Sequence, residues 1–173
     1  MSLLGMYEDI SQGDWQRDYL YKVSINPPLL AAPLLPDDID IFITDIKAPG
    51  SKQKVIKQDF AGQWANFAGP LDSSGTTEAT MLVDENGRLY KFLEAWHSLS
   101  GDDANASAFP KNQFTGQVTV TLYKTDKSTP VMSVNLTGAW IPELGELPTD
   151  KTQENLLKVK VVFAFDKRQT VFY

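Results

Sequence analysis

Long stretches of this sequence alternate apolar and polar side chains, and this period of two restricts the fold more than any other feature. The stretch from Tyr19 to Ile25 is typical, because its odd-numbered residues are aromatic or β-branched and alternate with Leu20, Lys22 and Ser24. Successive side chains of a β-strand point to opposite faces, so the pattern predicts a half-buried strand. Further strands are predicted at residues 39–46, around 62–68 and 77–84, at 115–124 and 131–140, and from about 156 to 165.

One segment has the period of an α-helix instead. Its apolar residues follow the spacing i, i+3, i+4, i+7 and i+10, which places them on one helical face. They are Leu89, Phe92, Leu93, Trp96 and Leu99. Gly101 and the polar residues 102–105 are predicted to end the helix and to form a loop after it.

Together these elements predict a mostly β protein, an antiparallel β-barrel or β-sandwich with one packed α-helix and long interface loops. The turn-forming residues 126–130 connect two of the strands as a hairpin. The length of 173 residues is that of one ordinary domain, and no repeat or linker divides it. We therefore expect a single domain over residues 1–173, with residues 1–14 as an N-terminal arm.

The composition excludes most catalytic and metal-binding chemistry. The chain has no cysteine and a single histidine, His97, which rules out thiolate nucleophiles, Cys zinc sites and His-rich metal sites. Neither a Walker A motif nor a GxGxxG phosphate loop occurs in it. We expect no catalytic residue, no metal, no cofactor and no enzymatic activity.

The charge balance and the hydropathy narrow the class of partner. Acidic residues outnumber basic ones by 22 to 16, which gives a formal charge of −6. Tight duplex binding depends on Lys and Arg side chains, so this balance disfavours it. The N-terminus lacks the basic start and apolar core of a signal peptide, and no apolar run reaches the roughly 18 residues of a transmembrane helix. Membrane insertion is not expected.

The remaining candidates for a chemical site are weak. His97 has no other metal ligand at a suitable spacing, so it is interpreted as an ordinary helix residue. Residues 84–87, Asp-Glu-Asn-Gly, lack the regular spacing of a calcium loop and predict a turn that leads into the helix. Asp102 with Asp103, or Glu143 with Glu146, resemble catalytic carboxylate pairs, but an acidic chain offers such pairs by chance.

Residues 27–36 combine prolines with four leucines. Prolines interrupt ladder pairing, so this segment is predicted to be a surface connection, where Leu29 and Leu30 would lower solubility unless another surface covers them. Two interpretations remain open, a loop folded onto its own core or an assembly interface. The same choice applies to the apolar residues near the N-terminus, Leu3, Leu4, Met6, Tyr7 and Ile10.

Two motifs are more specific. Residues 13–25, with Gly13, Asp14 and Arg17 ahead of the first strand, resemble the opening of tail tube proteins of contractile-tailed bacteriophages. Residues 136–147 are similar to a second motif of that family, carried by Trp140, Pro142, Gly145, Glu146 and Leu147. The helix that contains Trp96 falls where the family places its single helix.

The second motif also has a physical interpretation. Pro142 is expected to end the strand ladder, Gly145 to permit a turn, and Leu147 to return to the core.

The resemblance implies a structural virion protein. It implies that copies form hexameric rings that join edge to edge into a continuous inner β-barrel and stack into a hollow tail tube. The implied partners are other copies of the chain, the tail sheath protein, and the baseplate and tape-measure proteins, with transient, non-specific passage of DNA. The implied location is the tail tube of a virion assembled in the host cytoplasm.

The resemblance also implies where the copies meet. In the family a long loop after the second strand contacts the next ring, and here it corresponds to Lys47 through Phe60. Our hypothesis is that Lys52, Lys54 and Lys57 meet acidic residues of that ring. The expected inter-ring and inter-subunit interface comprises Gly13, Asp14, Arg17, Leu29, Leu30, Lys47, Lys52, Lys54, Lys57 and Phe60.

Other roles fit the same sequence features. A baseplate-proximal tube initiator and a tail terminator share the family resemblance, and the type VI secretion tube protein is similar in fold. A different class is a soluble ligand-binding β-barrel whose apolar loop lines a pocket. For a tube, the acidic balance predicts that the lumen-facing strands carry net negative potential, over which DNA slides without binding.

Overall fold

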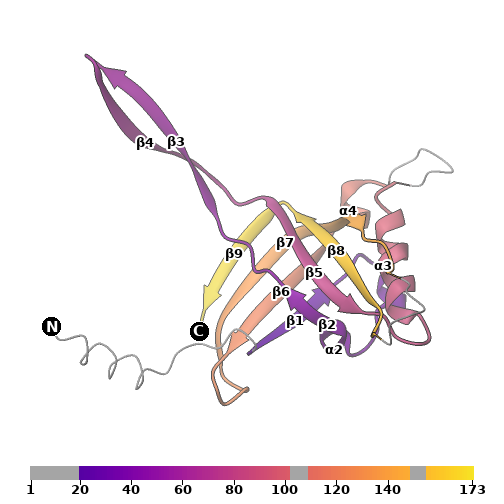
Figure 1. The fold of residues 1–173 in the computed structure, drawn as a ribbon. Coiled ribbons are helices and arrows are strands. Elements are labelled where there is room, and N and C mark those ends of the chain that lie inside the picture. Colours follow the sequence, from indigo (N-terminus) through magenta and orange to yellow (C-terminus); the bar gives the residue numbers. More distant parts are fainter. Residues whose placement is uncertain (1–19, 102–108, 149–154) are drawn as a thin grey trace.

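Antiparallel strands make up most of the computed structural model, which describes residues 20–101, 109–148 and 155–173 (Figure 1). The elements in chain order are β1 (Tyr21–Asn26), η1 (Ala32–Leu34), α2 (Ile39–Phe42), β2 (Ile43–Ile46), β3 (Lys52–Phe60), β4 (Gln63–Asp72), β5 (Gly75–Leu82), α3 (Arg88–Ser98), α4 (Lys111–Phe114), β6 (Gly116–Tyr123), β7 (Pro130–Leu144), β8 (Lys158–Phe165) and β9 (Lys167–Phe172). The predicted mostly β, antiparallel fold is confirmed, and the described strands form sandwich-like sheets rather than a closed barrel.

The long strand β7 belongs to both layers of the sandwich. Its first part pairs with β6 and with β9, from Met132↔Phe172 to Thr137↔Lys167, whereas its last part pairs with β8. One sheet therefore has the order β1-β6-β7-β9, and the other contains β2, β5, β8 and the end of β7. All of these pairings are antiparallel.

Gly138 marks the place where β7 passes between the two layers. Gly116 of β6 pairs with Ala139 and Gln117 pairs with Thr137, so Gly138 is the extra residue of a β-bulge. Its φ is +69°, a conformation that side chains rarely adopt, and a Cβ there would collide with the carboxylate of Asp166.

Substituting Gly138→Ala is expected to lower the free energy of unfolding by about 2 kcal/mol or more, because strain and collision add. Gly50→Ala is the matched control, since a Cβ at Gly50 meets no atom within 4 Å and its φ is not positive. Urea denaturation of both variants measures the difference. Equal stability of the two variants would contradict the role given to the bulge.

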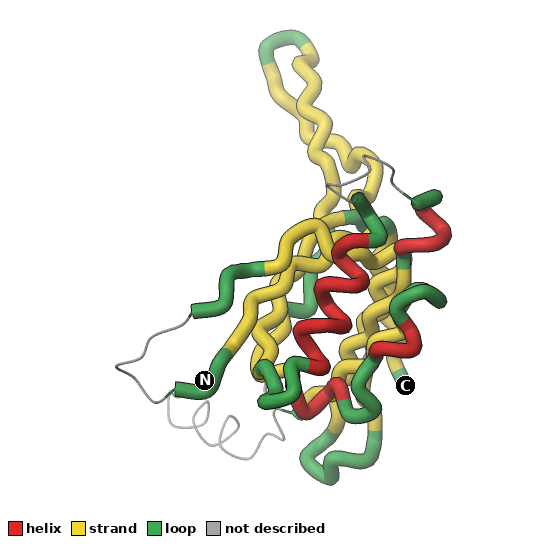
Figure 2. Tube along the Cα trace, turned by 90° about the vertical axis from the view of Figure 1, so that its right-hand side faces the viewer, coloured by secondary structure: helices red, strands yellow, loops and turns green. Residues whose placement is uncertain are grey.

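The helix α3 closes the core on one side. Leu89, Phe92, Leu93 and Trp96 are fully buried, as their spacing predicted. The Trp96 ring packs on Phe92 and Phe163 with centroid distances of 5.8 and 5.7 Å, and its Nε1 donates to the carbonyl oxygen of Phe114 at 2.8 Å. Figure 2 shows α3 lying against the strands.

The predicted turns are confirmed. Asp126 accepts hydrogen bonds from the Thr129 side chain and backbone and from the Ser128 backbone, which together hold the pKa of its carboxyl at about 2. At the start of α3, Gly87 N donates to the Asp84 carbonyl oxygen at 2.9 Å. The chain therefore reverses between β6 and β7 and turns into α3 where the sequence indicated.

Three predictions about local structure were wrong. Residues 39–46 are not one strand, because Ile39 and Ile43 are both buried one helical turn apart and α2 precedes β2. Pro142 does not end β7, which continues to Leu144, although the pairing with β8 is irregular between Trp140 and Glu143. The segment Lys47 to Phe60 is not a loop, since most of it forms β3.

Candidate assembly surfaces

The hairpin β3–β4 stands away from the two sheets (Figure 1). Its strands pair from Lys52↔Asp72 to Phe60↔Gln63, and nearly every residue is exposed. Ala61 and Gly62 form the two-residue turn with φ of +51° and +85°, which is the geometry that suits a tight hairpin. The hairpin is thus held by its own ladder and not by the core.

Large apolar side chains cover both faces of this exposed hairpin. On one face Ile56 lies opposite Phe67, and the Phe60 and Phe67 rings meet edge to face at 6.0 Å. On the other face Trp64 is 73% exposed. Contiguous apolar surface of this kind marks an interaction site, because water does not stabilise it.

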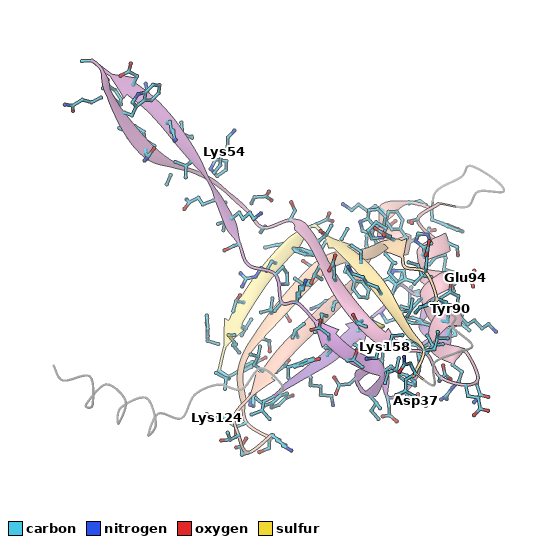
Figure 3. The ribbon with its side chains drawn as sticks, in the orientation of Figure 1. Asp37, Lys54, Tyr90, Glu94, Lys124 and Lys158 are labelled. Atoms are coloured by element: carbon cyan, nitrogen blue, oxygen red, sulfur yellow. The ribbon has the colours of Figure 1, made fainter. Side chains whose placement is uncertain are left out.

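The four lysines expected at the interface do not form one patch. Lys54 and Lys57 have opposite parity along β3, so they lie on different faces of the hairpin (Figure 3 labels Lys54). Lys52 lies opposite Asp72 in the strand register. The pKa of Asp72 is lowered first by hydrogen bonds from Ser74 and also by the charge of Lys52. Lys47 lies at the base and forms an ion pair with Glu78 at 3.6 Å.

Both end strands of the β1-β6-β7-β9 sheet have an open edge among the described residues. Tyr123 N donates to Leu20 O, so in the antiparallel alternation the backbone groups of residues 21, 23 and 25 point away from β6. Tyr173 N donates to Val131 O, so those of residues 168, 170 and 172 point away from β7. Such edges are ready to pair with another strand.

Polar groups at these edges are incompletely paired. On β9, Arg168 Nε and Thr170 Oγ1 are buried and have no hydrogen-bond partner among the described residues. Buried polar groups are normally satisfied, so each such group indicates a missing partner. At the β1 edge, Val23 N donates to Asp40 Oδ1 at 2.6 Å.

The outer face of the same sheet is polar. The inward residues of β1, β6 and the first part of β7 are apolar, and the alternate residues of all four strands form a continuous field of mostly hydroxyl and amide side chains. The field contains Lys22, Ser24, Asn26, Gln117, Thr119, Thr121, Ser133, Asn135, Thr137, Lys167, Gln169 and Val171. None of these residues is acidic.

The proline-rich segment 27–36 is partly folded onto the core and partly exposed, so each of the two interpretations fits a part of it. Leu34 and Leu35 pack against the core, whereas Leu29 is 91% and Leu30 55% exposed. The segment therefore folds back at one end and presents two leucines at the other.

The motif residues divide between core and surface. Trp96 is buried, Trp140 packs edge to face on Phe114 at 5.9 Å, and Leu147 packs on the core as predicted. Glu146 is exposed. Gly145 donates from its N to Lys160 O at 2.7 Å, and a Cβ would meet that oxygen, so close strand approach explains this glycine. Gly13, Asp14 and Arg17 lie outside the described residues.

Two residues considered as possible metal ligands, His97 and Asp84, form hydrogen bonds within the fold. His97 Nδ1 lies 2.7 Å from Ile141 O, and the pKa of Asp84 is lowered first by the hydrogen bond from Leu89 N and then by Arg88. In the described ranges no group of His, Asp or Glu side chains is arranged to hold a metal ion. None of the described helices has the length and hydropathy to cross a bilayer.

Three solved structures contain chains with a similar fold. The PVC sheath/tube terminator of an extracellular contractile injection system, in its extended state, has a TM-score of 0.65 at 15% identity, covering 92% of this chain and 99% of that chain. The extended PVC sheath-tube complex also scores 0.65, at 14% identity over 100% and 99%. The 6-fold symmetrised baseplate of the anti-feeding prophage scores 0.63, at 12% identity over 93% and 98%.

Sequence comparison assigns the family. No curated protein sequence matches the chain. The family described as phage tail tube protein matches residues 16–170, which is most of the length. The resemblance carried by the two motifs is therefore confirmed, and the chain belongs to the phage tail tube protein family.

Proposed function

We propose that this protein is the structural subunit of the inner tube of a contractile tail, where copies form stacked six-membered rings. The observation that carries the proposal is the combination of a sheet with two open edges and an exposed apolar hairpin. Both features are liabilities in a lone subunit and become joints in a polymer. The 6-fold symmetry of a baseplate containing a chain of the same fold supports six copies per ring.

The order β1-β6-β7-β9 supports the proposed ring closure. Because four strands alternate in direction, a copy rotated about a ring axis presents its β1 antiparallel to the β9 of its neighbour. Both strands are six residues long, and in each of them three residues point their backbone N–H and C=O groups toward the open edge. A head-to-tail contact of this kind closes into a ring when the rotation divides a full turn.

Stacking is assigned to the hairpin. A ring of six copies would present six hairpins, and their apolar faces would be covered by the next ring. The lysines at positions 47, 52, 54 and 57, with Phe60 and the exposed Leu29 and Leu30, belong to the proposed interfaces between copies. Gly13, Asp14 and Arg17 are proposed to act in the same interfaces, within a single domain that begins with an N-terminal arm.

The polar outer face of the β1-β6-β7-β9 sheet is proposed to line the lumen. It bears two lysines and no carboxylate, so it does not support the negative potential that we expected from the net charge. Eight of its unburied residues are Ser, Thr, Asn or Gln, which would solvate passing DNA without counterion release. Weak affinity would then come from a low density of positive charge, two lysines among neutral polar side chains, rather than from repulsion.

The proposed partners are the sheath around the tube, the baseplate below it and the tape-measure protein inside it, in a virion assembled in the host cytoplasm. The role is structural and includes no catalytic step. Among tube positions we favour the repeating subunit, because the family that matches residues 16–170 is described as phage tail tube protein.

Purified protein is expected to form rings or tubes in negative-stain electron microscopy. Sedimentation velocity over a wide concentration range provides the second measurement. A persistent monomer at high concentration would contradict the proposal and favour the soluble ligand-binding β-barrel. Single rings that never stack would favour a terminator or an initiator.

A further inference from the structure

Asp40 makes an unusual contact for an acidic side chain beside a strand. Its Oδ1 accepts the hydrogen bond from the Val23 backbone N–H at 2.6 Å. This N–H is the middle of the three that point out from the β1 edge. The carboxylate therefore occupies the place of the carbonyl oxygen that a paired strand would supply.

The contact can be released locally. A groove of about 430 Å³ lies between β1 and the segment Leu35–Ile41, so the two are not continuously packed. Ile39 anchors α2 in the core, whereas the Asp40 side chain is only partly buried. A change of the Asp40 rotamer frees Val23 N–H without moving the core.

The β1 edge is rich in negative charge. Asp37 and Asp38 precede α2 (Figure 3 labels Asp37), and Asp45 lies on β2. The pKa of Tyr21 on β1 is raised first by burial and then by Asp45 and Asp40, which places both carboxylates near this strand. None of these aspartates forms an ion pair with another described residue.

The opposite edge of the same sheet is positive. Lys167 and Arg168 begin β9, and neither forms an ion pair within the described ranges. Arg168 Nε is also buried without an acceptor there. A second copy of the chain therefore offers at β1 the carboxylates that β9 lacks.

We propose that Asp40 guards the β1 edge of the free subunit and changes partner on assembly, from its own Val23 N–H to Arg168 of the neighbouring copy. This inference rests on the ring proposed above. On assembly a β9 carbonyl oxygen takes over Val23 N–H, and Arg168 gains a carboxylate. The middle N–H of the edge is thus occupied in the free subunit, and an acidic side chain on an edge is one of the ways in which natural sheets limit unspecific pairing.

The test is a charge swap between copies. Asp40→Arg alone places Arg opposite Arg168, and Arg168→Asp alone places Asp opposite Asp40, so each is expected to reduce ring formation by about tenfold or more. An equimolar mixture is expected to recover assembly to within about threefold of wild type, because alternating copies make every contact attractive in an even-numbered ring. Sedimentation velocity and electron microscopy measure the assembled fraction, and circular dichroism checks folding.

The matched control uses two exposed residues of α3. Glu94→Arg and Lys91→Asp make the same charge changes away from both edges, so they are expected to assemble normally alone and mixed. The double variant D40R/R168D is also expected to assemble by itself. If the double variant assembles and the mixture does not, the contact lies within one chain and the inference is wrong. If wild type forms rings and the mixture stays unassembled, the inference falls while the proposed function stands; if wild type forms no rings, both fall.

Hydrogen exchange tests the guard itself. The unassembled variant R168D keeps Asp40, so its Val23 amide is expected to exchange at least about tenfold more slowly than in D40A/R168D. Adding Asp40→Asn instead retains an acceptor oxygen and is expected to keep most of the protection. Equal exchange in all three variants would overturn the guarding role.

Discussion

Replacing Ile56, Phe60 and Phe67 together with serine is expected to abolish tubes and leave rings intact. These residues form one apolar face of a hairpin that projects from the sheets, so the substitutions remove no core contact. Each side chain is about half exposed, so covering it contributes about 1 kcal/mol, and every copy in a ring repeats the loss. The concentration needed for tubes should rise by at least about a hundredfold, as measured by electron microscopy and sedimentation.

The thermal midpoint of this triple variant should stay within a few degrees of wild type, because the affected surface is exposed in the subunit. Leu156→Ser is the control, since Leu156 is 74% exposed and lies outside the hairpin. Charge reversal at Lys52, Lys54 and Lys57 separates the electrostatic contribution to stacking from the apolar one. This charge reversal should change the salt dependence of stacking without abolishing the tubes. Tubes of normal length from the serine variant would show that another surface joins the rings.

The periodic elements of this fold could be predicted because burial imposes their pattern. The helix α3 places its apolar residues on one face, and most strands alternate because one face meets the core. The hairpin could not be predicted in the same way. Its apolar side chains, such as Ile56 and Trp64, occur on both faces, and no core selects one of them.

The strand β9 was missed for a related reason. Its inward positions include Arg168 and Thr170, so the strand has no apolar face to predict it. The irregular positions depend on neighbours distant in sequence. Asp40 bonds to Val23, and Gly145 lies against Lys160, and neither contact leaves a local pattern. The edge strand β9 and the Asp40 contact at β1 can therefore be identified only once the strand pairing is known.

Thr170→Pro is expected to prevent ring closure while leaving the subunit folded. The Thr170 N–H points away from β7, so proline removes no bond of the native ladder and is tolerated on an edge strand. It does remove a donor to the neighbouring copy and adds ring atoms where that strand must approach. One lost hydrogen bond costs only about 1 kcal/mol, but the collision and its repetition at every interface should reduce ring formation at least about tenfold.

Two variants at the same edge make this prediction specific. Thr170→Ser keeps both the N–H and the hydroxyl and should assemble like wild type. Val171→Pro removes an N–H that faces β7, so it should lower the thermal midpoint instead. Analytical ultracentrifugation and thermal unfolding distinguish the two effects. If Thr170→Pro closes rings as well as Thr170→Ser does, β9 is not the joint, and ring closure uses another open edge, such as that of β2, which pairs only with β5 among the described strands.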